Sequence, residues 1–62
     1  MTIARVKQAA SIRDIYFDGC KKWINNVVGF GYFAYTPHGF IQADTLNGFY
    51  KMVMRCPKIK NN

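Results

Sequence analysis

Acidic and metal-binding side chains are scarce in this chain of 62 residues. Its three carboxylates, Asp14, Asp18 and Asp44, form no evident pair for acid–base catalysis. One histidine and two cysteines fall short of the four ligands of structural zinc, and no C-x-x-C spacing is present. Residues 29–34 match the letters G-x-G-x-x-A of dinucleotide-binding loops, but they lead into a predicted strand instead of a helix. We therefore predict a protein that is not an enzyme and uses no cofactor or metal.

A signal peptide and an uninterrupted apolar span are also missing. The first residues lack the apolar core of a secretory signal, and glycine, asparagine and proline interrupt the uncharged stretch 23–43. We expect a cytoplasmic protein without membrane contact, in which Cys20 and Cys56 remain reduced thiols. The length allows one small domain, residues 1–62, with a polar C-terminal tail at 57–62.

Apolar spacing in the first half predicts helices. Isoleucine, tyrosine, cysteine, tryptophan and valine recur at the i, i+3, i+4, i+7 spacing of an amphipathic helix from about residue 12 to residue 26. Ser11 and Asp14 approximate a capping box at its start, and Thr2 can cap a shorter helix before it. A continuous heptad pattern makes one long helix the alternative. We favour two helices with a break near residues 10–12.

The middle of the chain predicts a β-hairpin. Residues 31–36 are rich in aromatic strand formers. Pro37, His38 and Gly39 are typical turn residues, so residues 40–43 should return as an antiparallel strand.

Residues 44–55 have two interpretations. Asn47 and Gly48 are a strong hairpin signal, which would make this segment a third strand. Alternatively, Asp44 caps a helix with large apolar side chains on one face, ending before Pro57. We favour the helix.

Together these elements predict an α+β fold. It has two N-terminal helices (or one long helix), an antiparallel β-hairpin and a C-terminal helix around one small core. The expected core centres on Phe17, Trp23 and Phe49.

Positive charge is confined to the two ends of the chain. Residues 1–22 hold five cations against two acids, and residues 51–62 hold four cations and no acid. Residues 23–50 hold no cation. If the fold brings both ends together, they form one basic surface able to neutralise phosphates. The candidate nucleic-acid-binding residues are Arg5, Arg13, Lys21, Lys22, Lys51, Arg55 and Lys58.

Aromatic side chains suggest a second kind of surface. Side chains of a hairpin alternate between two faces, and the helices can cover only one of them. An outward aromatic patch would bind bases of a single strand or a protein surface. The hairpin itself carries no lysine or arginine, which favours a protein partner. The candidate protein-binding residues are Tyr32, Phe33, Tyr35 and Phe40.

In the predicted order of elements, the second helix ends near Cys20-Lys21-Lys22-Trp23-Ile24, and the last helix opens with Asp44-Thr45-Leu46. This arrangement resembles that of small phage excisionases and MerR-like winged-helix proteins. That resemblance implies a second helix in the major groove of DNA and a hairpin wing on the backbone or in the minor groove. It also implies that Arg13, Lys21 and Lys22 face DNA.

Two functions are consistent with these observations. The first is nucleic-acid binding, with DNA favoured, by a small regulatory or recombination accessory protein using a basic helical face. The second is binding to a host protein, as a phage- or plasmid-type inhibitor or adaptor acting through the aromatic hairpin. The sequence leaves the oligomeric state open.

Overall fold

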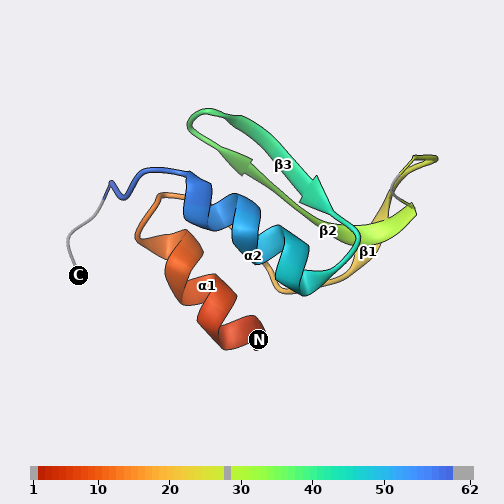
Figure 1. The fold of residues 1–62 in the computed structure, drawn as a ribbon, viewed down its shortest axis with the longest axis horizontal. Helices are drawn as coiled ribbons and strands as arrows, with labels where there is room; N and C mark the ends of the chain where they lie inside the picture. Colours follow the sequence, from red (N-terminus) through yellow and green to blue (C-terminus); the bar gives the residue numbers. More distant parts are fainter. Residues whose placement is uncertain (1, 28, 60–62) are drawn as a thin grey trace.

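The structure is a computed structural model that describes residues 2–27 and 29–59. Its elements are α1 (Ile3–Ser11), β1 (Lys22–Asn25), β2 (Gly29–Thr36), β3 (Gly39–Ala43) and α2 (Leu46–Arg55). The strands form one antiparallel sheet in the order β1-β2-β3. Helix α2 lies between the β2–β3 hairpin and α1, and it contacts both (Figure 1). The α+β class is thus confirmed, with two helices and a three-stranded sheet.

Helix α1 begins at the predicted cap, where the Thr2 hydroxyl accepts a hydrogen bond from the Arg5 backbone N–H at 3.2 Å. It ends in a left-handed turn, because Asp14 has a φ of 58°. The Ile15 N–H donates to the Ala10 carbonyl at 2.9 Å, the six-to-one bond typical of a Schellman motif. Asp14 therefore follows the end of a helix and does not begin a second one.

The prediction of a helix over residues 12–26 is wrong. Ile15 and Phe17 are buried while Tyr16 between them is exposed, which is the alternation of an extended chain. Gly19, with a φ of 80°, turns the backbone again before β1. The segment that the winged-helix resemblance would place in the major groove is therefore a loop followed by a strand.

The β2–β3 hairpin confirms the predicted pair of strands. The register runs from Thr36 opposite Gly39 to Tyr32 opposite Ala43, around a turn at residues 37–38. Strand β1 pairs with the first residues of β2 and has an irregular register between Trp23 and Asn25.

Helix α2 decides between the two interpretations of residues 44–55. The segment is a helix, and the third strand of the sheet is β1 instead. Its cap is Thr45, whose hydroxyl accepts from the Gly48 N–H at 3.0 Å, and not Asp44. The helix ends at Arg55, two residues before Pro57.

The core lies between α1, α2 and one face of the hairpin. Phe49 is fully buried, and its ring centroid is 4.6 Å from that of Phe17 and 6.3 Å from that of Tyr32. Trp23, expected in the core, is 59% exposed. The buried apolar residues are Val6, Ala10, Ile15, Phe17, Ala34, Phe49 and Val53.

Two expectations about the rest of the chain can be compared with the structure. In the described residues, neither helix has the length and apolar character needed to cross a membrane. The predicted polar tail has no helix or strand at residues 57–59, and residues 60–62 lie outside the described residues.

Asp14 offers a simple test of the α1 terminus. Replacing it with glycine should raise the free energy of unfolding by about 1 kcal/mol, because glycine adopts a left-handed conformation freely. The change also removes a negative charge from the negative end of the helix dipole. Thermal unfolding followed by circular dichroism measures the gain, expected as a rise of about 4–8 °C. Asp14→Asn removes the charge but keeps a Cβ atom, so the further gain of Asp14→Gly over Asp14→Asn reports the conformational freedom of glycine. A lower melting temperature for Asp14→Gly would contradict this account.

Candidate functional site

Four predicted cations lie on α1, on α2 and just after α2. Arg5 and Lys58, far apart in the sequence, line the same hollow of about 250 Å³ between the helices. Lys51 and Arg55 are exposed and one turn apart on α2. They directly follow Tyr50 and Met54, which line that hollow, so they point about 100° away from it, and Arg55 lines a separate cleft between α2 and β3. We call Arg5, Lys51, Arg55 and Lys58 the helical basic face.

In the part of the chain that the structure describes, no carboxylate forms an ion pair with the helical basic face. Among residues 2–27 and 29–59, the only ion pair joins Lys22 to Asp18, on the β1 side of the fold. Of the cations expected to converge from the two ends of the chain, the structure brings Arg5 and Lys58 to one hollow.

Arg13, which was expected to face DNA, also lines this hollow but is buried, so it does not belong to the exposed cations of this face. Its side chain is 4% exposed. Its Nε donates to the Cys56 carbonyl at 3.0 Å and its Nη1 to the Ala9 carbonyl at 2.8 Å. Both acceptors belong to C-terminal ends of helices, which carry partial negative charge. The guanidinium thus joins the ends of α1 and α2 and has a structural role.

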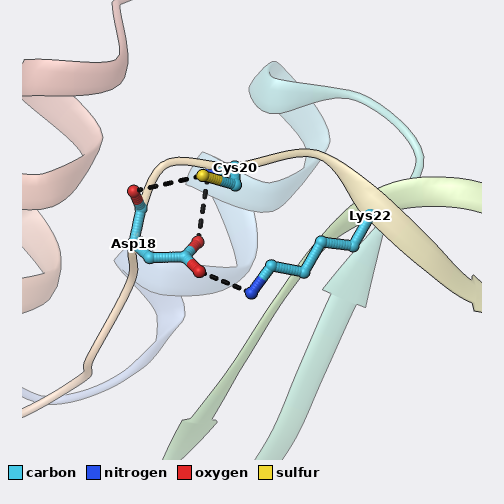
Figure 2. Close-up of polar contacts among 3 residues, drawn as sticks. All are labelled: Asp18, Cys20 and Lys22. Atoms are coloured by element: carbon cyan, nitrogen blue, oxygen red, sulfur yellow. Dashed lines mark hydrogen bonds and ion pairs between the residues drawn. The ribbon is translucent and has the colours of Figure 1, made fainter.

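Lys21 and Lys22 lie away from the helical basic face, before and at the start of β1. Lys22 Nζ contacts an Asp18 carboxylate oxygen, while the other oxygen accepts from the Cys20 N–H at 2.9 Å (Figure 2). The hydrogen bond from Lys22, followed by the one from Cys20, lowers the pKa of Asp18. The same contact with Asp18 raises the pKa of Lys22. Both shifts favour the charged forms, so the pair stays ionised at neutral pH.

The outward face of the hairpin carries three of the predicted aromatic residues. Phe33 and Tyr35 alternate with residues packed on the core, and Phe40 lies opposite Tyr35. The Phe40 ring centroid is 5.4 Å from that of Tyr35 and 5.5 Å from that of Phe33. Tyr35 is 73% exposed. Tyr32, the fourth predicted residue, is on the opposite face and packs edge-to-face with Phe17 in the core.

Trp23 borders this aromatic surface, although its pairing with Phe30 directs its ring to the other face of the sheet, where the two ring centroids are 5.9 Å apart. It lines a hollow of about 210 Å³ together with Ile24, Phe33, Tyr35 and Phe40. We call Phe33, Tyr35 and Phe40 the aromatic sheet face. Trp23 was expected in the core because it fitted the helical spacing predicted for residues 12–26, whereas it lies in a strand with a partly open face.

A cation lies beside the aromatic sheet face, although the hairpin itself carries no lysine or arginine. Lys22 Nζ lies 5.2 Å from the centroid of the Phe33 ring, within the range of a cation–π contact. It comes from β1, so it is distant in sequence and adjacent in the sheet.

The other candidate chemical groups are dispersed. Cys20 and Cys56 are unpaired, and Cys20 is exposed in a loop. His38 is at the exposed hairpin turn. Within the described part of the chain, no group of three or more metal-ligating side chains converges.

No protein-family model matches the chain, and comparisons with curated proteins and with solved structures also return no match.

Proposed function

We propose that this protein binds nucleic acid through the helical basic face. The observation that carries the proposal is the convergence of Arg5 from α1 with Lys58, which lies beyond α2, on one hollow. Exposed, unneutralised cations at fixed positions displace counterions from a phosphate backbone, which provides affinity independent of sequence. The net charge of +6 adds long-range attraction.

The arrangement modifies the mode of binding expected from the sequence. A helix over residues 12–26 is not available to enter a major groove, and Arg13 is buried. The phosphate contacts instead come from the exposed sides of α1 and α2. Contacts of this kind position a protein on nucleic acid without selecting a base sequence.

Salt dependence tests the proposal directly. Labelled duplex DNA and a labelled single strand are titrated with the protein at several salt concentrations, with fluorescence anisotropy as readout. We expect log affinity to fall linearly with log salt for the natural chain. Lys51→Gln combined with Arg55→Gln should reduce the slope on duplex by about 1.8, since each lost phosphate contact removes about 0.9.

A matched variant separates the helical basic face from net charge. Lys7→Gln combined with Lys21→Gln removes the same charge, but the Lys7 side chain lies beside Gly19 and Lys21 precedes β1. This variant should retain nearly the natural slope on duplex. Absence of binding to both probes at low salt would overturn the proposal. Equal losses in the two variants would show that the helical basic face is not the binding surface.

A further inference from the structure

The helical basic face and the aromatic sheet face are connected along the edge of β3. Arg55 lines a cleft of about 470 Å³ that is also lined by His38 and Phe40. Phe40 is in turn in contact with the Tyr35 and Phe33 rings. Phe33 carries Lys22 above its ring. A continuous surface therefore runs from Arg55 across the exposed rings of Phe40 and Tyr35 to Phe33, which the paired Lys22 covers.

This order of groups determines what the surface can bind. Aromatic rings bind the flat faces of nucleic-acid bases, while flanking cations bind the phosphates that link them. In a duplex the base faces are stacked inside the helix and are not accessible. A single strand exposes both its bases and its phosphates along the same path. The occupant whose chemistry fits is a single strand of DNA or RNA.

We infer that the aromatic sheet face is a base-stacking platform, which gives the protein a preference for single-stranded over duplex nucleic acid. This inference rests on the proposed function and specifies its substrate class. The strand enters from the helical basic face at Arg55 and stacks bases on Phe40 and Tyr35, the two rings of the platform that are exposed. Lys22 is paired with Asp18 and lies over Phe33, so it covers that ring and bounds the platform at the far end.

The chain contains its own reporter for this site. Trp23 is the only tryptophan, and it lines the same hollow as Phe33, Tyr35 and Phe40. Bases that stack on these rings should quench its fluorescence. We expect oligothymidylate and oligouridylate to quench Trp23 at low salt, and a duplex bound by the helices to leave its emission nearly unchanged. Comparing the two oligonucleotides shows whether DNA or RNA is preferred.

Substitutions at Tyr35 test whether stacking provides the affinity. Tyr35→Ala should weaken binding to the single strand by about 5- to 150-fold, the effect of losing one stacked base. Tyr35→Leu keeps apolar area without a planar ring and should lose a similar factor, whereas a hydrophobic protein partner would tolerate it. Val27→Ala is the matched control, since Val27 is 94% exposed and outside the hollow. Circular dichroism verifies that each variant is folded.

The outcomes separate the two proposals. If neither single strand nor duplex binds, the proposed function itself is wrong. If both bind equally, without quenching and without an effect of Tyr35→Ala, the helical basic face binds nucleic acid and the base-stacking platform is refuted. That second result would leave the aromatic sheet face as a surface for a protein partner.

Discussion

Arg13→Met is expected to destabilise the fold by about 3 kcal/mol, although it removes a charge from a strongly basic protein. The guanidinium donates to the carbonyls of Ala9 and Cys56. Methionine fills a similar volume but cannot donate, so two carbonyls lose their partner at about 1–3 kcal/mol each. A domain of this size has a total stability of about 3–5 kcal/mol. The variant should therefore be largely unfolded at physiological temperature.

Urea denaturation followed by far-ultraviolet circular dichroism measures this loss, because exposed Trp23 is a poor reporter of unfolding. Arg5→Met is the matched control: it makes the same replacement at an exposed position of α1 and should change stability by less than about 0.5 kcal/mol. Arg13→Lys keeps the charge but not the planar fork, and should recover only part of the loss. Equal stability of Arg13→Met and Arg5→Met would refute the structural role of Arg13.

The elements that the sequence predicted correctly are those determined by nearby residues. The Thr2 cap acts on a backbone N–H three residues away. The β2–β3 turn is contained in residues 36–39. Helix α2 follows from its own periodicity, which buries Phe49 and Val53 together. In each case the decisive interaction lies within a few residues, so the pattern of side chains is sufficient.

The helix predicted over residues 12–26 failed because its signals are ambiguous. Ser11 and Asp14 occur at helix starts, but here Asp14 adopts a left-handed conformation that ends α1. The apolar residues in this segment fit a helical period. The chain is extended instead, so Ile15 and Phe17 are buried on the same side while Tyr16 is exposed. Which period applies depends on Phe49 and Tyr32, which pack against Phe17 from distant parts of the chain.

The candidate site was predictable in composition and not in arrangement. Counting charges identified the cations, but burial of Arg13 depends on a carbonyl supplied by Cys56, 43 residues away. Likewise, the hairpin sequence carries no cation, and Lys22 reaches Phe33 only because β1 pairs with β2. Such contacts arise from tertiary structure and leave no local pattern.

Gly31→Ala is expected to lower the free energy of unfolding by at least about 3 kcal/mol, since a buried backbone clash exceeds ordinary overpacking. It should also disturb the packing between β3 and α2. A Cβ atom on Gly31 would lie 2.3 Å from the Ala43 carbonyl oxygen and 3.0 Å from the Asp44 Cα. These are backbone atoms, so the clash cannot be relieved by a side-chain rotation. Relief requires movement of residues 43–44, which lead into α2, the helix at the centre of the fold.

Gly29→Ala in the same strand is the comparison that isolates this clash. Gly29 has a φ of 75°, but the nearest atom to its added Cβ is a Trp23 ring carbon at 4.0 Å. Alanine at position 29 should lower the free energy of unfolding by about 1–2 kcal/mol, because only the left-handed conformation is unfavourable there. The difference between the two variants in urea denaturation reports the close approach of β2 to the β3–α2 connection. If Gly31→Ala proved no less stable than Gly29→Ala, this packing of β2 against the connection would be wrong, and the position of α2 on the hairpin with it.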